Sequence, residues 1–382
     1  MMTLPSELAG GRVTINLGAL KDNWRHLSHC AGTAECGAVV KANGYGCGVE
    51  TVAKALHEAG CRTFFVAVPE EGLRLRSVLP EVQCYVLNGL FPDASEHFVK
   101  AGLTPVLSSM RELIQWADHA KSVGEQLSYG LMLDTGMTRL GISANEAEEL
   151  AQNSALSAQI KPTLLMTHYA CADDLGHPKT DVQRETFLQL SSHFPGVPKS
   201  AANSAASLQS DFPGHGSHAF EMVRPGIALY GGEALNNVPN PMKPVVTLEA
   251  KIMQIRHAKA GDTVGYGAAE TLTRPSRIAY VSVGYADGYH RAASHAGVNL
   301  RAVTGAAHAH FNGHKLQGVG RISMDMSGFD VTDIPEDEIA AGDWIELFGP
   351  NVPVDDVARA SGTIGYELLT GLGGRYERRF ID

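Results

Sequence analysis

The sequence has no long hydrophobic run, since no apolar stretch approaches the ~18 residues that a transmembrane helix needs. It also has no block of lysine or arginine, and its net charge is −10, so a nucleic-acid-binding surface is not expected. The first residues, MMTLPSELAGGRVTIN, do not have the basic start and apolar core of a secretory signal. We therefore expect a cytoplasmic protein.

Cysteine is scarce and scattered. Six cysteines occur in 382 residues, and no two of them form a CxxC pair. A chain of this length buries enough surface to fold without disulfides, so we interpret the cysteines as free thiols in a reducing compartment. His308, His310 and His314 lie close together in the sequence, but no carboxylate cluster accompanies them, and we expect no metal site.

What the sequence does contain is an alternation of short apolar runs and helix-like segments. Helical spacing of apolar residues occurs, for example, in Glu50–Ala59, Glu70–Leu79, Met110–Ala120, Asn145–Gln152 and Asp181–His193. The strand-like runs number eight: Gly37–Lys41, Thr63–Val68, Val82–Leu87, Thr104–Leu107, Ser128–Leu133, Thr163–His168, Lys199–Asn203 and Met222–Leu229. A doubly wound sheet would give the same rhythm, but eight strands favour an α/β fold with a (β/α)8 TIM barrel.

The pattern changes after residue 238, where NNVPNPMKP has the composition of a linker. Further apolar runs follow, separated by turns, and no long helical pattern appears until near Val354. These runs are Val245–Gln254, Arg277–Val283, Leu300–Val303, Leu316–Ile322 and Trp344–Leu347. We predict a barrel domain over residues 12–238 and a mostly-β C-terminal domain over residues 239–382, with residues 1–11 packing on the latter.

Barrel enzymes carry their chemistry at the C-terminal ends of the strands, and several reactive residues of this sequence fall there. Lys41 ends the first predicted strand, His168 the sixth and Asn203 the seventh, while Arg224 lies in the eighth. A lone lysine at a strand end is usually a solvated side chain. At the apolar mouth of a barrel, however, its amine loses hydration, its pKa falls, and it can form a Schiff base with a carbonyl compound.

Two weaker signals indicate an anion site. The hydroxyl of Ser204 and the backbone N–H groups beside Gly226 and Ile227 are groups that bind phosphate, although caps and turns use the same residues. The glycines after Lys41 do not form the dinucleotide fingerprint, because position 49 is valine. A lysine together with a phosphate site suggests a cofactor with an aldehyde and a phosphate, which describes pyridoxal 5′-phosphate (PLP).

The segment VVKANGYGCG (39–48) resembles the cofactor-lysine signature of the alanine racemases, a family of barrel-type (fold type III) PLP enzymes. The resemblance continues in family order over nearly the whole chain. Its segments are LDTGMTRLG (133–141), THYACAD (167–173), NSAAS (203–207), VRPGIALYG (223–231), VGYG (264–267), VGYADGYHR (283–291), GRISMDM (320–326) and GTIGYELL (362–369). An ordered set of this size is far more specific than any one segment.

The resemblance implies a role for each matching position. Lys41 would bind PLP covalently, and Lys41 and Tyr266 would be the two catalytic acid–base groups. Arg224 would face the pyridine nitrogen, with His168 between Arg224 and Tyr266. The remaining implied groups are the phosphate contacts Tyr45, Ser204, Gly226, Ile227 and Tyr366 with Asn203 nearby, the substrate contacts Arg139, Met324 and Asp325, and the substrate corridor Asp173, Tyr285, Arg291, Arg321 and Ile364.

The resemblance also implies the activity: interconversion of L- and D-alanine in a head-to-tail homodimer, supplying D-alanine for peptidoglycan, with Tyr266 and Met324 reaching the site of the other subunit. An amino-acid racemase of broader or different specificity, for example for serine, is one alternative, and a non-catalytic PLP-binding protein is another. One position departs from the family pattern. Met132 occupies the place of a lysine that is often carbamylated, so we expect another anion or a water beside Arg139.

Overall fold

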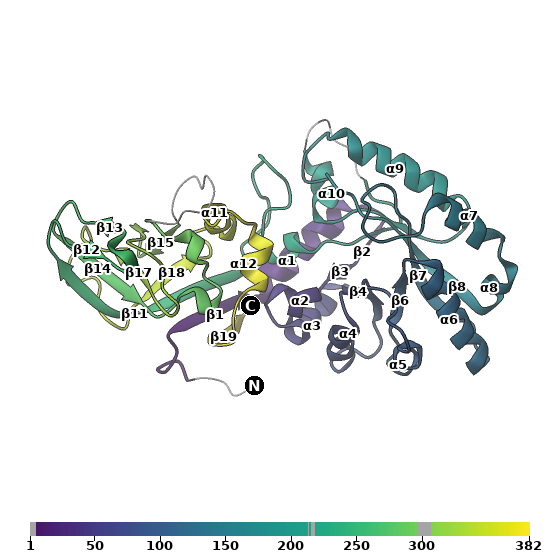
Figure 1. Ribbon diagram of the computed structural model, residues 1–382, viewed down its shortest axis with the longest axis horizontal. Helices are drawn as coiled ribbons and strands as arrows, with labels where there is room; N and C mark the ends of the chain where they lie inside the picture. Colours follow the sequence, from purple (N-terminus) through teal and green to yellow (C-terminus); the bar gives the residue numbers. More distant parts are fainter. Residues whose placement is uncertain (1–4, 213, 215–217, 297–306) are drawn as a thin grey trace. The chain divides into compact units, whose positions relative to one another are not determined.

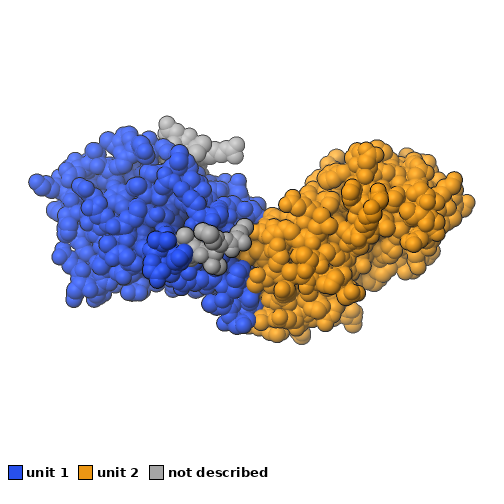
Figure 2. All heavy atoms as spheres, turned by 90° about the horizontal axis from the view of Figure 1, so that it is seen from below, with its two compact units in different colours: residues 1–19, 230–232, 243–382 blue, residues 20–229, 233–242 orange. Residues whose placement is uncertain are grey.

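The computed structural model describes residues 5–212, 214, 218–296 and 307–382. The chain forms two compact units, coloured separately in Figure 2. The barrel unit comprises residues 20–229 and 233–242, and the β unit comprises residues 1–19, 230–232 and 243–382. The predicted domain boundaries, 12–238 and 239–382, stay a prediction.

The barrel unit contains a parallel sheet of seven strands in sequence order (Figure 1). Its central strands are buried on both faces, as in β4, where all four residues are buried, because helices cover the outside and side chains fill the inside. The strands are β3 (Ala38–Val39), β4 (Thr63–Val66), β5 (Gln83–Val86), β6 (Thr104–Leu107), β7 (Leu127–Met132), β8 (Ile160–Met166) and β9 (Lys199–Ser200). Each coincides with one of the first seven predicted runs.

The eighth run closes the barrel with only a two-residue strand, β10 (Met222–Val223), which pairs with β2 (Glu35–Cys36). On one side the Arg224 N–H donates to the Ala202 carbonyl at 2.9 Å. On the other side the Gly37 N–H donates to the Val223 carbonyl at 3.0 Å, just before β3. The predicted run is longer than the strand because Pro225 has no N–H with which to continue the ladder. The TIM-barrel interpretation is confirmed.

Helices connect the strands, and all five predicted helical segments are present. Two of them begin at a serine whose hydroxyl caps the first turn: Ser109 accepts from the Glu112 N–H, and Ser143 from the Glu146 N–H. The helices are α1 (Leu17–Cys30), α3 (Val49–Ala59), α4 (Pro69–Arg76), α5 (Ser95–Lys100), α6 (Met110–Val123), α7 (Ala144–Gln152), α8 (Ser154–Gln159), α9 (Pro178–Ser191) and α10 (Ser204–Leu208). No helix in the described ranges has both the length and the apolar character needed to cross a bilayer.

The β unit is built on an eight-stranded sheet, so the prediction of a mostly-β second domain is confirmed. Its strands are β1 (Gly11–Asn16), β11 (Val246–Ala258), β14 (Ser276–Val281), β15 (His308–Phe311), β16 (His314–Gln317), β17 (Ser327–Asp330), β18 (Trp344–Phe348) and β19 (Glu377–Ile381). A hairpin of β12 (Thr263–Val264) and β13 (Glu270–Thr271) forms a separate two-stranded sheet, whose Val264 packs in one buried cluster with Ile278 of β14. Two short helices, α11 (Val354–Ala360) and α12 (Gly365–Thr370), follow β18. The predicted run Leu300–Val303 lies outside the described residues.

The first strand of the chain belongs to the β unit. Strand β1 pairs antiparallel with β11 and parallel with β19, so the two ends of the chain lie in one sheet. Its residues alternate between buried and half-buried, and Val13 and Ile15 are completely buried. This alternation is the pattern of a strand with one face on the core.

Candidate active site

Lys41 follows β3 and opens a left-handed turn, α2 (Lys41–Tyr45). Ala42, Asn43 and Tyr45 have φ angles of 52°, 56° and 50°, in a region that residues other than glycine rarely adopt. Such a run of left-handed residues costs roughly 1–2 kcal/mol per residue and persists only where the surroundings enforce it. Strain of this kind, directly after a half-buried lysine at a strand end, marks a functional site.

Asn43 is the residue that holds this turn in place. Its Oδ1 accepts hydrogen bonds from the Val49 N–H at 3.1 Å and from Arg74 Nη2 at 2.7 Å. Arg74 is fixed in turn by a two-point ion pair with Glu50, with the Nε–Oε1 distance at 2.7 Å. The Asn43 N–H donates to Glu71 Oε1 at 3.3 Å. Helices α3 and α4 therefore clamp the turn that carries Lys41.

The electrostatic setting of Lys41 favours a reactive amine. Burial lowers the pKa of Lys41, the positive charge of Arg139 lowers it further, and Glu71 acts in the opposite direction. The neutral amine is the form that can attack a carbonyl group or accept a proton. Lys41 and Arg139, both predicted site residues, are therefore electrostatically coupled.

A second group of predicted residues forms a small cradle at the next strand ends. Ser204 is buried at the start of α10, and its hydroxyl accepts from the N–H groups of Gly226 at 2.8 Å and Ala228 at 3.3 Å. The Tyr45 hydroxyl comes so close to Gly226 that a Cβ there would stand 2.3 Å from it. Two hydroxyls and backbone N–H groups therefore converge, which suits a phosphate. Asn203 caps α10: its Oδ1 accepts from the Ala206 N–H at 3.0 Å, which fixes the first turn of the helix next to the cradle.

Arg224 lies in the barrel interior, 5% exposed. Its Nη1 donates to Ser200 Oγ at 2.5 Å and its Nη2 donates to the Thr167 carbonyl at 2.7 Å. Burial lowers the pKa of Arg224 to about 10, so the guanidinium remains charged at neutral pH. A buried permanent donor, held from two neighbouring strands, suits a hydrogen-bond acceptor such as a pyridine nitrogen.

His168 follows β8 and is surrounded by cations. Burial lowers the pKa of His168 to about 3, and Arg224, Arg139 and Lys41 contribute in that order. Its imidazole is therefore neutral at physiological pH. The backbone is held by Gln183, whose Nε2 donates to the His168 carbonyl at 2.9 Å. His168 can thus offer a hydrogen bond, but not a positive charge, to a neighbouring group.

Arg139 belongs to the loop after β7. Asp134 organises that loop, because its Oδ1 accepts from the N–H groups of residues 136, 137 and 138, and Thr138 has a left-handed φ of 58°. Met132 is buried, but the Arg139 side chain is exposed in the single chain. The expectation of an anion beside Arg139 assumed a buried guanidinium, and an exposed one does not require such a partner.

In the β unit, Tyr266 lies in the loop of the β12–β13 hairpin and is 64% exposed. The loop winds through left-handed residues, including Gly265, Gly267 and Ala268. It packs on Arg321, since a Cβ at Gly267 would stand 2.9 Å from Arg321 Nη1. The hairpin and the segment around Arg321 are tied further by a short hydrogen bond from the Gly320 N–H to the Glu270 carboxylate.

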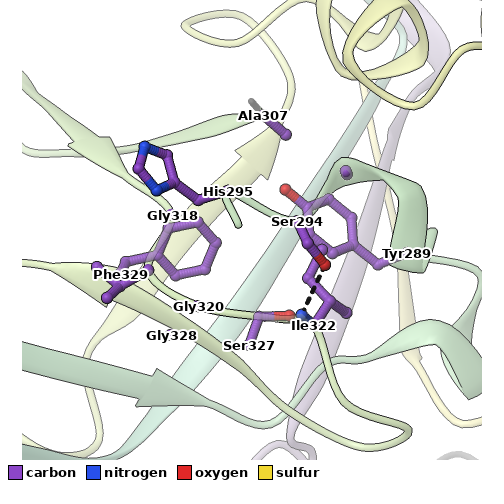
Figure 3. A pocket seen from close by; sticks show the side chains of 12 residues that line it. Tyr289, Ser294, His295, Ala307, Gly318, Gly320, Ile322, Ser327, Gly328 and Phe329 are labelled. Carbon is purple, nitrogen blue, oxygen red and sulfur yellow. Dashed lines mark hydrogen bonds between the residues drawn. The ribbon is translucent and has the colours of Figure 1, made fainter. Parts of the chain in front are cut away.

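Met324 and Asp325 form an exposed turn beside Tyr285. The Tyr285 N–H donates to the Ser323 carbonyl at 3.1 Å, which joins the predicted corridor to the predicted substrate contacts. Ser294 Oγ accepts from the Ile322 N–H at 2.8 Å, the dashed contact in Figure 3. On the other side of the turn, Arg375 Nη1 donates to Asp325 Oδ1 at 2.7 Å and its Nε donates to the buried Asp287 at 2.6 Å.

Four other predicted residues are exposed on their own unit. Arg291 is exposed in a short 3-10 helix of the β unit, and Ile364 and Tyr366 lie at the start of α12. Asp173 is exposed on the barrel unit, where its Oδ2 accepts from Asn236 Nδ2 at 2.9 Å. Within each unit the structure therefore assembles the main candidate residues, while these four lie on the surface.

Several residues that position the site were not predicted. They are Asn43, Thr167, Ser200 and Arg375, and none of them is a reactive group. A signal existed for two of them, because Thr167 is a polar residue near the end of an apolar run and Ser200 is a polar residue inside a predicted strand, where a buried hydroxyl or carbonyl needs a partner. Arg375 carried no such signal, since its partners lie 88 and 50 residues away in the sequence.

Comparison with known proteins gives a consistent result over the whole chain. Residues 15–234 match the family model for the alanine racemase N-terminal domain, and residues 245–380 match the model for the alanine racemase C-terminal domain. The chain is 48% identical to an alanine racemase of Rhizobium meliloti, with 98% of this chain and 97% of the relative aligned. It is 47% identical to a biosynthetic alanine racemase of Agrobacterium fabrum, over 98% and 95% of the two chains.

Solved structures agree with the sequence relatives. The alanine racemase of Bartonella henselae, determined with covalently bound pyridoxal phosphate, superimposes with a TM-score of 0.88 at 38% identity. The alignment covers 98% of this chain and all of that one. The match includes the C-terminal β domain as well as the barrel, so a barrel-only PLP-binding protein does not describe this chain.

Proposed function

Because the chain belongs to the alanine racemase family, we propose how its residues interconvert L- and D-alanine. The enzyme is a PLP-dependent isomerase. The observation that carries the residue assignment is the convergence of the strained Lys41 turn and the Ser204–Gly226 cradle, which share Tyr45. That arrangement fits a ligand with an aldehyde at one end and a phosphate at the other.

We assign the cofactor contacts as follows. Lys41 holds PLP covalently, Tyr45, Ser204, Gly226 and Ile227 hold its phosphate with Asn203 and Tyr366 nearby, and Arg224 donates to the ring nitrogen. When bound, PLP withdraws electrons from the substrate Cα and so acidifies its proton. The guanidinium of Arg224 donates a hydrogen bond without giving up its proton, which limits this withdrawal. We infer that limited withdrawal favours racemisation over decarboxylation and transamination.

The proton itself is moved by two groups. Racemisation removes a proton from one face of Cα and returns one to the other face, so a base is needed on each. Lys41 Nζ serves the face of D-alanine, and Tyr266 Oη serves the face of L-alanine. Lys41 suits the role because burial and Arg139 favour its neutral amine.

The neutral imidazole of His168 links Arg224 to Tyr266 in this proposal. With its low pKa, His168 contributes a hydrogen bond to the phenol oxygen and no net charge. Arg139 and the backbone N–H of Met324, which lies beside Asp325, orient the substrate carboxylate. Asp173, Tyr285, Arg291, Arg321 and Ile364 line the corridor through which alanine enters.

We also propose a cytoplasmic head-to-tail homodimer in which Tyr266 and Met324 complete the site of the other subunit. The high exposure of Tyr266 and Met324, at 64% and 53%, supports this assignment, because a catalytic phenol in a single chain would be expected to lie in a closed site. The D-alanine formed would supply peptidoglycan synthesis.

Exchange of the Cα proton with deuterated water tests the two-base assignment. Tyr266→Phe should slow exchange of the L-alanine Cα proton by at least about a hundredfold, since a positioned base contributes roughly 10²–10⁴-fold. Exchange from D-alanine should be retained. Lys41→Ala should prevent borohydride from fixing PLP to the chain. Equal loss of exchange from both enantiomers in Tyr266→Phe, or PLP fixed to a peptide without Lys41 in the parent, would contradict the assignment.

A further inference from the structure

Three side chains that commonly ligate metals meet on the barrel unit, away from the candidate active site. His26 and Cys30 are four residues apart on α1 and so share one face of that helix. Asp211 ends a short 3-10 helix, η1 (Gln209–Asp211), which follows α10. His26 Nε2 lies 2.7 Å from Asp211 Oδ2, and Cys30 Sγ donates to Asp211 Oδ1 at 3.2 Å. One ligand atom from each residue lies within 4.8 Å of the other two.

We propose that His26, Cys30 and Asp211 form a binding site for a divalent transition-metal ion, with Zn²⁺ as the best fit. Imidazole, thiolate and carboxylate are the three protein donors that Zn²⁺ uses, whereas Mg²⁺ and Ca²⁺ prefer oxygen ligands alone. Three protein ligands leave one tetrahedral position for water. A thiolate and a carboxylate would also neutralise both charges of the ion.

Rotation of the three side chains would bring them to the spacing that a tetrahedral ion requires. Zn–N and Zn–O bonds of about 2.0–2.2 Å and a Zn–S bond of about 2.3 Å place tetrahedral ligand atoms about 3.3–3.6 Å apart. The contacts of Asp211, 2.7 Å from its Oδ2 to His26 and 3.2 Å from its Oδ1 to Cys30, are hydrogen-bond distances and have to lengthen by a few tenths of an ångström or more. The three ligand atoms lie within 4.8 Å of one another, so side-chain rotation also has to bring the most distant pair closer by up to about 1.5 Å. Asp211 is exposed and His26 and Cys30 are half-buried, so rotation of these side chains is not blocked by a packed core.

The backbone on both sides of the site is rigid. On α1, Leu27 is completely buried between the two ligands, and the Trp24 indole N–H donates to the Cys36 carbonyl at 3.2 Å. On the other side, the buried Gln209 anchors η1 through its Nε2, which donates to the Ala172 carbonyl at 2.8 Å. Ligands on anchored elements keep their spacing without the metal, which is a requirement for affinity.

The proton balance of binding follows from the same contacts. Without metal, the thiol proton of Cys30 lies in its hydrogen bond to Asp211. Burial, followed by the contact with Asp211, raises the pKa of Cys30 to about 12. Coordination forms an S–metal bond, breaks the S–H bond and releases that proton to the solvent. His26 would bind the metal through Nε2, which now contacts Asp211, so the single N–H proton of the neutral imidazole has to lie on Nδ1 in the metal-bound state. One proton is therefore released in all, with no change in oxidation state.

Equilibrium dialysis of the tag-free, PLP-loaded protein against Zn²⁺ tests the site. We expect one ion per chain, and X-ray absorption at the zinc edge should show one sulfur at about 2.3 Å with nitrogen and oxygen ligands at about 2.0–2.2 Å. Absence of tight binding, or a bound ion with no sulfur ligand, would overturn the proposal.

Variants assign the binding to these residues. Cys30→Ser and Asp211→Asn should each weaken Zn²⁺ binding by at least about tenfold, because even the outer neighbours of a metal ligand are worth that much. Cys171→Ser and His29→Gln are matched controls, since Cys171 is the other half-buried cysteine and His29 is the exposed histidine next to Cys30 on α1. PLP absorbance reports that each variant is folded. Undiminished binding in both Cys30→Ser and Asp211→Asn would refute the site, as would equal losses in the controls.

Discussion

At the scale of single residues, the most informative group is His168, a neutral imidazole beside two arginines and a lysine. Its pKa of about 3 in the folded chain compares with 6.5 for an ordinary histidine. Between pH 3 and pH 6.5, His168 therefore binds a proton in the unfolded chain but not in the folded chain. Above pH 6.5, His168 is neutral in both states and does not reduce the free energy of unfolding. As the pH falls from 6.5 toward 3, the unfolded chain gains the proton first, so the free energy of unfolding decreases.

His168→Gln should remove this acid sensitivity. In the PLP-free parent, lowering the pH from 7 to 5 should cost about 2 kcal/mol of unfolding free energy through His168 alone. The variant should lose about 2 kcal/mol less than the parent over that interval, as measured by urea unfolding at the two pH values. His97→Gln, at an exposed histidine of α5, is the control and should behave as the parent. Parallel losses in parent and His168→Gln would show that the imidazole is protonated in the folded chain.

Gly226 provides a second test at residue scale. A methyl group at this position would stand 2.3 Å from the Tyr45 hydroxyl, so either the tyrosine or the cradle has to shift. Overpacking of this kind typically costs about 1–3 kcal/mol, so Gly226→Ala should bind PLP about 5- to 150-fold less tightly in dialysis. Gly374→Ala adds the same methyl group where no atom lies within 4 Å. Unaltered PLP retention in Gly226→Ala would argue against a phosphate site at the cradle.

At the scale of elements, two variants of Asn43 in the left-handed turn after Lys41 distinguish the contribution of the side chain from that of the backbone conformation. Asn43→Gly and Asn43→Ala both remove the acceptor for Val49 and Arg74, but only alanine keeps a Cβ at a φ of 56°. We expect both variants to be less stable than the parent, with Asn43→Ala about 1 kcal/mol below Asn43→Gly in urea unfolding. Equal stability of the two variants would mean that the turn relaxes to a right-handed conformation.

The elements also show what a sequence reveals about a fold. Apolar runs such as Thr63–Val68 predicted the barrel strands, here β4, because burial on both faces leaves a continuous apolar signature. The same criterion predicted an eighth strand that is too long, because an apolar run does not show that Pro225 ends the hydrogen-bond ladder. Strand β1 pairs with partners more than 200 residues away, and no local pattern contains that information.

For the site, the sequence identified the reactive residues but not the residues and backbone conformations that hold them in place. Lys41, His168 and Arg224 could be selected because reactive side chains at strand ends are conspicuous and because the surrounding motifs resemble a known family. The left-handed conformation of Ala42 and Tyr45 could not be selected, because residues with a Cβ adopt it only under tertiary constraint. The neutrality of His168 likewise depends on neighbours from other strands.

At the scale of the whole molecule, the proposed exchange of residues between subunits has a direct consequence for mixtures. Lys41→Ala and Tyr266→Phe homodimers should each be inactive in alanine racemisation. Dissociated and reassociated together, they should form heterodimers in which one of the two sites contains both intact residues. With random reassociation of equal amounts, about a quarter of the parent activity should return, because half of the dimers are mixed and half of their sites are intact. Activity that never exceeds that of the separate variants would exclude the contribution of Tyr266 in trans.

The pairing of β1 with β11 and β19 also determines when each unit becomes complete during synthesis. Every residue of the barrel unit has been made once Met242 leaves the ribosome, so that unit can fold while translation continues. Strand β1 is made before the barrel but has no partner until Val246–Ala258 has been made, and its parallel neighbour β19 is made later still. While the barrel is being made, the nascent chain therefore carries an unpaired strand with one apolar face, and a chaperone could bind that face during this interval.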